Sequence, residues 1–169
     1  MAWDIELVEI VRGLVGDLNR DNPTYTDTRL MELILIGGQT LKGDATFGNS
    51  YTIDVDECTL TPDPTTGTKD DAFINLVCLK TAVIILFSEW RTASDKAISV
   101  KDDVSSIDSK SVAAEKGMLA KEMKKNFDAA MKQYRAGYSA PGAAIIGPYC
   151  IGRYTDGGTF TRDFNSVIN

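Results

Sequence analysis

The chain has 169 residues, 43% of them hydrophobic, and a formal net charge of −6, which suits one domain with a real core, since domains run to roughly 100 to 200 residues. The acidic balance argues against adhesion to nucleic acid or anionic lipid, because such binding depends on clustered Lys and Arg. Histidine is absent, and this removes the commonest general base, Ser-His and Cys-His nucleophile pairs, and the usual zinc sites.

The cellular setting is predicted from cysteines and termini. Cys58, Cys78 and Cys150 are too few and too scattered for a disulfide framework, which favours a reducing compartment. The N-terminus is acidic where a secretory signal would be basic, and the longest apolar run, Ala82 to Phe87, is far shorter than a membrane span. We therefore expect a soluble, intracellular product with no membrane contact.

Two helices are predicted in the first 42 residues. The first carries apolar residues at three- and four-residue spacing and ends near the polar run before Pro23. The second begins after Thr26 or Asp27, either of which can cap it, and Gly37 and Gly38 either weaken it or permit close packing. The apolar face of the first helix is Trp3, Leu7, Ile10, Val11, Leu14 and Leu18.

A strand and a long core helix follow. Residues 51–56 alternate between apolar and polar, which is typical of a half-buried strand, and the TPDP turn ends it. A helix over 70–93, capped near Thr68, is predicted to be central to the core. Within it, Lys80 is expected to extend from the helix edge to solvent. Its apolar surface is Phe73, Leu76, Val77, Val83, Ile84, Phe87 and Trp90.

The last third of the chain contains a ribbon and another helix. Residues 97–108 are predicted to form a hairpin or extended ribbon. A helix over 111–137, with Gly137 as its C-cap, carries lysines opposite an apolar stripe. These lysines (Lys121, Lys124, Lys125 and Lys132) are expected to pair within the helix. The stripe is Val112, Leu119, Met123, Phe127, Ala130, Met131 and Tyr134.

Residues 138–169 form a segment rich in glycine and aromatic residues, without helical periodicity. It is either an extension that contains strands or an arm that becomes ordered on a partner. Disordered tails are usually poor in aromatic residues, so contact with a partner is favoured over a merely solvated tail. The residues of this arm proposed to bind a partner or a neighbouring subunit are Tyr149, Arg153, Tyr154, Phe160, Arg162 and Phe164.

Two acidic groups raise the question of a metal site, because Mg²⁺ and Ca²⁺ prefer oxygen ligands. The first is Asp54, Asp56 and Glu57, and the second lies in the 97–108 ribbon. Neither has calcium-loop spacing, so solvated acids at strand ends are the favoured interpretation, and we predict no catalytic residue, metal or cofactor. The ribbon residues expected to meet a neighbouring subunit or another partner are Lys101, Asp102, Asp103 and Asp108.

The order of these segments carries a resemblance. The YTDTRL helix start at Tyr25 to Leu30, the core helix from Asp71 and the ribbon with its ISVKDD and SID runs together resemble the head-to-tail connector proteins of bacteriophages, over about Trp3 to Gly137. The resemblance implies a mainly α fold, in which a four-helix domain (1–137) with an inserted strand and ribbon precedes an extended arm (138–169). It also implies a non-enzymatic adaptor that forms a ring, usually a dodecamer, beneath the portal.

The partners implied are further copies of the chain, the portal protein, and a tail or neck protein. DNA would pass through the channel without sequence-specific binding. The location would be the capsid-tail junction of a virion assembled in the bacterial cytoplasm. A head-closure or tail-terminator ring is the nearest alternative, and a small carboxylate-based or metal-dependent enzyme is the alternative from another class.

Overall fold

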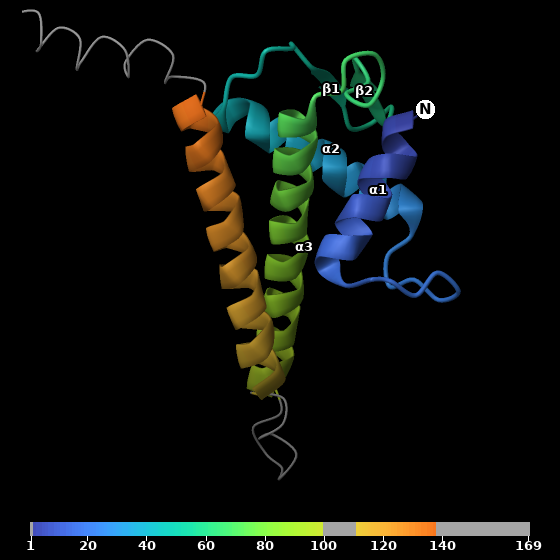
Figure 1. Ribbon diagram of the computed structural model, residues 1–169. Helices are drawn as coiled ribbons and strands as arrows, with labels where there is room; N and C mark the ends of the chain where they lie inside the picture. Colours follow the sequence, from blue (N-terminus) through green and yellow to red (C-terminus); the bar gives the residue numbers. More distant parts are fainter. Residues whose placement is uncertain (1, 100–110, 138–169) are drawn as a thin grey trace, which may run out of the picture. The chain divides into compact units, whose positions relative to one another are not determined.

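A computed structural model describes residues 2–99 and 111–137, which form four helices and one two-stranded sheet (Figure 1). The mainly α fold is therefore confirmed. The helices are α1 (Ala2–Val15), α2 (Asp27–Asp44), α3 (Asp71–Ser99) and an unlabelled one, orange in Figure 1, called here the 111–137 helix. The chain divides into one compact unit, Met1–Met131, and a second, Lys132–Asn169. All contacts described below lie within the first unit.

Helix α1 packs the expected apolar face into the core but ends earlier than predicted. Trp3, Leu7 and Val11 are buried on that face. Gly16 adopts a positive φ of 83° and ends the helix, and the amides of Gly16 and Asp17 both donate to the carbonyl of Arg12. Leu18 consequently lies beyond the helix with 74% of its surface exposed, so its predicted place on the apolar face of this helix is wrong.

Helix α2 begins at the predicted cap and packs closely on α3. The Thr26 hydroxyl accepts a hydrogen bond from the Arg29 amide at 3.3 Å. A Cβ atom at Gly37 would lie only 2.5 Å from Thr81 Oγ1 on α3, and one at Gly38 only 2.9 Å from Ile53 Cδ1. Of the two alternatives for these glycines, close packing is therefore the correct one.

The predicted strand is shorter than expected and belongs to a hairpin. Strand β1 (Thr52–Asp54) pairs antiparallel with β2 (Thr59–Thr61). The Asp54 carboxylate accepts hydrogen bonds from the amides of Asp56 and Glu57, both at 3.0 Å, and so holds the connecting turn. Before the strand, Tyr51 is buried and stacks on Phe73 of α3.

Helix α3 is the central helix, as predicted, but both of its ends differ from expectation. The Asp70 carboxylate, two residues after the predicted cap position at Thr68, caps it by accepting from the Phe73 amide at 3.0 Å. The helix continues to Ser99, so residues 97–99 of the predicted ribbon are helical, and the rest of that ribbon lies outside the described residues. By length and composition Asp71–Asp95 could cross a membrane, and 44% of its most apolar stretch is buried inside the unit.

The 111–137 helix packs on α3 through smaller residues than predicted. Gly117 lies so close to Trp90 that an added Cβ would be 2.9 Å from the indole Nε1. With this approach Val112 and Leu119, which belong to the predicted apolar stripe, lie toward solvent with 47% and 55% of their surfaces exposed. The residues of this helix that are buried are Ala113, Gly117, Ala120, Phe127 and Met131.

Candidate assembly surface

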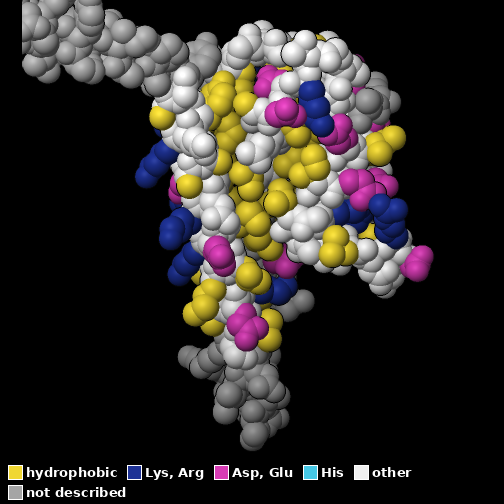
Figure 2. All heavy atoms as spheres, viewed as in Figure 1, with side chains coloured by type: hydrophobic (Ala, Val, Ile, Leu, Met, Phe, Trp, Pro, Cys, Tyr) yellow, Lys and Arg dark blue, Asp and Glu magenta, His cyan; other side chains and the backbone are white. Residues whose placement is uncertain are grey.

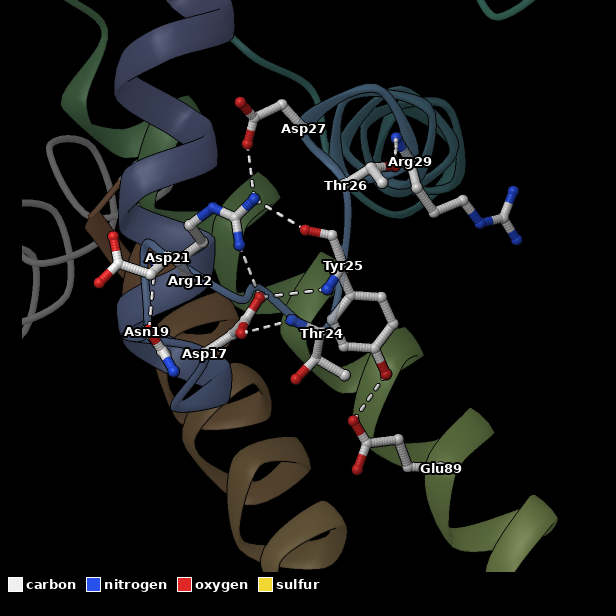
Figure 3. Close-up of polar contacts among 10 residues, drawn as sticks. All are labelled: Arg12, Asp17, Asn19, Asp21, Thr24, Tyr25, Thr26, Asp27, Arg29 and Glu89. Atoms are coloured by element: carbon white, nitrogen blue, oxygen red, sulfur yellow. Dashed lines mark hydrogen bonds and ion pairs between the residues drawn. The ribbon is translucent and has the colours of Figure 1, made fainter.

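A buried ion-pair network joins the end of α1 to the start of α2 (Figure 3). The Arg12 guanidinium donates to Asp17 Oδ2 at 2.6 Å, to the Tyr25 carbonyl at 2.8 Å and to Asp27 Oδ1 at 2.5 Å. Only 11% of the Arg12 side chain and 5% of the Asp17 side chain are exposed. Such a pair is stable only when its remaining polar atoms are also satisfied, and the Tyr25 carbonyl and Asp27 serve this purpose for Arg12.

Asp17 is the acceptor at the centre of this network. Its Oδ1 accepts from the Thr24 amide at 2.9 Å, and its Oδ2 accepts from the Tyr25 amide at 3.3 Å. Burial raises the pKa of Asp17, but the two amide hydrogen bonds and the Arg12 charge more than offset this, and the pKa lies below its ordinary value. Asp17 therefore stays ionised at neutral pH and holds the 16–26 connection against α1.

A second polar chain extends this connection to α3 and the 111–137 helix. The Tyr25 hydroxyl donates to Glu89 Oε1 at 2.6 Å, as drawn in Figure 3, and the Lys116 ammonium donates to Glu89 Oε2 at 2.9 Å. Burial and the Glu89 carboxylate raise the pKa of Tyr25. Burial also raises the pKa of Glu89, but the Tyr25 and Lys116 donors outweigh it and lower the net value. Glu89 thus joins three segments of the unit.

Beyond Glu89, the face of α3 that bears Phe87 is open. It contains a groove of about 670 Å³, and the ring of Phe87 packs edge-on against Trp90 there, with centroids 5.7 Å apart. A contiguous apolar patch on the surface marks an interaction site more often than apolar side chains scattered singly do. The groove is lined by Ile84, Phe87, Ser88, Trp90, Arg91 and Ser94.

The 111–137 helix adds exposed apolar side chains at the same end of α3. Val112, Met118 and Leu119 have 47%, 71% and 55% of their surfaces exposed. Figure 2 shows hydrophobic side chains along α3 between this helix and α1, with Lys and Arg on the helix's outer edge. We call the groove on α3 and the exposed Val112 and Leu119, which lie on different sides of the helix pair, together the candidate assembly surface.

The structure also locates the polar residues considered in the sequence. Lys80 was expected to extend to solvent, but only 22% of its side chain is exposed: its ammonium donates to Asp44 Oδ2 at 3.1 Å and lies 5.0 Å from the Phe127 ring centroid. Lys121 was expected to pair within its own helix, but its ammonium lies 5.7 Å from the Trp90 ring centroid. Within residues 2–99 and 111–137, no group of three or more His, Cys, Asp or Glu is placed to hold a metal.

All of the residues predicted to bind partners lie outside the described residues, so these predictions stay predictions. They are the ribbon residues Lys101, Asp102, Asp103 and Asp108 and the arm residues Tyr149, Arg153, Tyr154, Phe160, Arg162 and Phe164.

The polar network and the groove were not predicted from the sequence. Arg12 and Asp17 lie on either side of Gly16, and a pair of opposite charges across a helix-ending glycine is a signal that could have indicated the network. Glu89 and Lys116 are 27 residues apart, and no sequence pattern connects them. The groove exists where apolar residues of α3 are not covered by other helices. Sequence periodicity does not specify which residues are covered.

Comparison of the chain with protein-family models, curated proteins and solved structures finds no match.

Proposed function

We propose that the chain is a structural protein of a bacteriophage virion. It forms a ring, usually of twelve copies, that docks on the portal, extends the DNA channel and joins the capsid vertex to the tail. The observation that carries this proposal is the candidate assembly surface, where Phe87 and Trp90 are half-buried and Leu119 is 55% exposed. A helix hairpin that leaves such residues open is suited to pairing with another protein.

The order of the described elements supports the same proposal. Two helices, a strand element, a long core helix and a further long helix follow one another in the sequence of segments on which the connector resemblance rests. Each carboxylate of the core has a structural partner: Asp17 holds Arg12, Glu89 holds Tyr25 and Lys116, and Asp70 caps α3. These groups serve the fold, which is what a structural subunit needs.

The charge distribution suits a channel component. In Figure 2, Asp and Glu lie around α1 and the hairpin with some Lys and Arg among them, and Lys and Arg follow the outer edge of the 111–137 helix with some Asp and Glu beside them. An acidic wall repels the phosphates of passing DNA, because like charges do not offer the counterion release that drives binding. The net charge of −6 agrees with such a wall.

Docking on the portal is assigned to residues 138–169. This segment is rich in glycine and aromatic residues, and extended segments of this kind bind by adding main-chain hydrogen bonds and aromatic contacts to a partner. The ribbon residues from Lys101 to Asp108 are assigned to contact with the neighbouring subunit or the channel.

The test is co-sedimentation of the purified chain with the portal protein of the same phage, followed by electron microscopy. We expect a ring coaxial with the portal. A variant that lacks residues 138–169 should lose binding, while Asp102→Asn, Asp103→Asn and Asp108→Asn together should weaken ring formation. A chain that never binds the portal but caps a portal assembly already carrying another ring would contradict the adaptor role and favour a head-closure or tail-terminator ring.

A further inference from the structure

We propose that copies of this chain associate head to tail. The contact joins one side of the helix pair formed by α3 and the 111–137 helix in one copy to the opposite side of the same helix pair in the next copy. A stripe of residues on the 111–137 helix, Val112, Glu115, Leu119 and Glu122, enters the groove on α3 of a second copy. This inference rests on the proposed function, because it names the two surfaces by which neighbours in the ring would meet.

The stripe is continuous because its members are spaced by three and four residues, which places them on one face of a helix. Val112 and Leu119 are 47% and 55% exposed, and Glu115 and Glu122 are exposed between and beside them. Neither glutamate forms an ion pair with another described residue. The stripe therefore presents two apolar side chains flanked by two free carboxylates.

The groove has complementary chemistry. Ile84, Phe87 and Trp90 supply apolar walls, Ser88 and Ser94 supply hydroxyl groups, and Arg91 supplies an exposed guanidinium. Arg91 forms no ion pair within the described part of the chain. An arginine at the edge of an apolar groove can pair with a carboxylate of the partner when that carboxylate lies next to the apolar side chain that enters the groove. Glu115 and Glu122, on either side of Leu119, meet that requirement.

Stripe and groove lie at the same level along the helix pair. Lys116 pairs with Glu89 at 2.9 Å, and Gly117 approaches Trp90, so residues 112–122 run beside residues 84–94. Each segment rises about 15 Å over its ten intervals, because a helix rises about 1.5 Å per residue. Two surfaces of equal length at the same level allow successive copies to stand side by side without a step between them.

Stripe and groove also lie on opposite sides of the pair. Val112 and Leu119 are one turn from Lys116, which reaches Glu89 on one flank. Phe87 lies one helical turn from Trp90. The Lys121 ammonium lies over the Trp90 ring, and this marks the other flank of the helix pair. Contact between two different patches is heterologous, and it produces a ring when the rotation between copies closes. A self-complementary dimer would instead use one patch twice.

The test uses cross-linking by a short bismaleimide in a background of Cys58→Ser and Cys150→Ser, with buried Cys78 retained. Glu115→Cys alone and Arg91→Cys alone should give no cross-linked dimer. The two variants mixed should give a cross-linked heterodimer, even if association is weak. Because Glu115→Cys and Arg91→Cys remove the charge pair, the same test is repeated with Val112→Cys on the stripe and Ser94→Cys in the groove, which keep Arg91 and Glu115. Cross-linked homodimers of Val112→Cys alone, or no heterodimer in that second mixture at high protein concentration, would overturn the inference.

Point variants separate the contact from its neighbourhood. Leu119→Asp should lower the heterodimer yield roughly tenfold, as expected when a carboxylate replaces one buried apolar contact. Met118→Asp is the matched control, because Met118 is 71% exposed on the next position but lies off the stripe, and it should leave the yield unchanged. Arg91→Glu should abolish association of the full chain, and Glu115→Arg added to it should restore association. Equal loss from Leu119→Asp and Met118→Asp, or no rescue by the charge exchange, would contradict the proposed register.

Failure of this inference is distinguishable from failure of the proposed function. If the chain still co-sediments with the portal as a ring while the mixture gives no heterodimer, the connector role stands and the head-to-tail contact is wrong. If the heterodimer forms but the portal is not bound, the contact stands and the connector role is wrong.

Discussion

The two halves of α3 have similar apolar sequences and different surroundings. In the first half, Phe73 has no exposed surface, because Tyr51 stacks on it and Phe47 packs against its edge. In the second half, Phe87 and Trp90 are half-buried beside an open groove, with α1 and α2 no longer covering them. This difference teaches that an apolar helix face predicts burial against some other surface. It does not tell whether that surface belongs to the same chain or to another protein.

Truncating one phenylalanine in each half should give the largest contrast. We expect Phe73→Ala to lower the free energy of unfolding by about 4 kcal/mol, since the loss leaves a cavity in a fully packed site. Phe87→Ala should cost about 1 kcal/mol in the monomer, because Phe87 is already partly in water. Urea denaturation of both variants at low protein concentration measures the two values. Equal losses would mean that the second half of α3 is as well packed as the first.

The polar network at the end of α1 should show the next largest effect. Asp17→Asn should lower stability by about 2 kcal/mol at neutral pH, because hydrogen bonds to a charged group are worth about 1.5 to 3 kcal/mol each. Folding lowers the pKa of Asp17, so its contribution is present above the ordinary value of 3.8 and is lost as the pH falls below it.

Denaturation of the wild type and Asp17→Asn between pH 7 and pH 3 measures this dependence. The stability difference between the two proteins should shrink at the acidic end. Asp21→Asn is a suitable control, because Asp21 is exposed in the same connection. A difference that stays constant down to pH 3 would contradict the assigned charge state of Asp17.

Alanine substitution of two helix glycines, one facing each half of α3, compares how tightly the two halves are packed. Gly37→Ala should lower stability by about 1 to 3 kcal/mol, because the new Cβ would meet Thr81 Oγ1, whose hydroxyl is fixed to the Val77 carbonyl. Gly117→Ala should be nearly neutral: Trp90 borders an open groove and can shift, and alanine gains up to about 1 kcal/mol of helix propensity.

Thermal unfolding of both glycine variants tests this contrast, with Gly13→Ala as the control. No atom lies within 4 Å of a Cβ at Gly13, so that variant should be slightly more stable than the wild type. A Gly117→Ala variant as unstable as Gly37→Ala would show that Trp90 is rigidly held.

The rate of thiol modification should show that the first half of α3 is closed to solvent, and this measurement needs no destabilising substitution. Burial raises the pKa of the Cys78 thiol to about 12, so it stays protonated and enclosed at pH 8. We expect maleimide to modify half-buried Cys58 quickly and Cys78 only after unfolding, as read by mass spectrometry. Rapid modification of Cys78 in the native protein would mean that the first half of α3 opens readily.

The sequence was sufficient for the fold class and for most helix positions, because periodicity and capping are local. The start of α2 after Thr26 and the apolar face of α1 up to Val11 were predicted correctly. The ends that were wrong depended on single residues whose role is three-dimensional: Gly16 ends α1 before Leu18, and Asp70 caps α3 through its carboxylate.

The candidate surface was harder to predict than the elements that build it. The stripe predicted to bury Val112 and Leu119 is only half right, because small residues at 113, 117 and 120 rotate the helix toward α3. Val112 and Leu119 were assigned to the apolar stripe because their side chains are large and apolar. Close packing of the helix on α3 at Gly117 instead turns both side chains outward. Apolar periodicity identified Phe87 and Trp90, but their incomplete cover follows from the lengths of α1 and α2.

The most direct measurement is tryptophan oxidation by hydroxyl radicals, because the chain's two tryptophans report on the two regions. Trp3 is buried in α1 against the core, and Trp90 is half-buried at the groove. In the isolated chain we expect Trp90 to be oxidised and Trp3 to be protected. In the ring assembled on the portal, Trp90 should become protected while Trp3 is unchanged. A Trp90 equally reactive before and after assembly would contradict the assignment of this half of α3 to a protein contact.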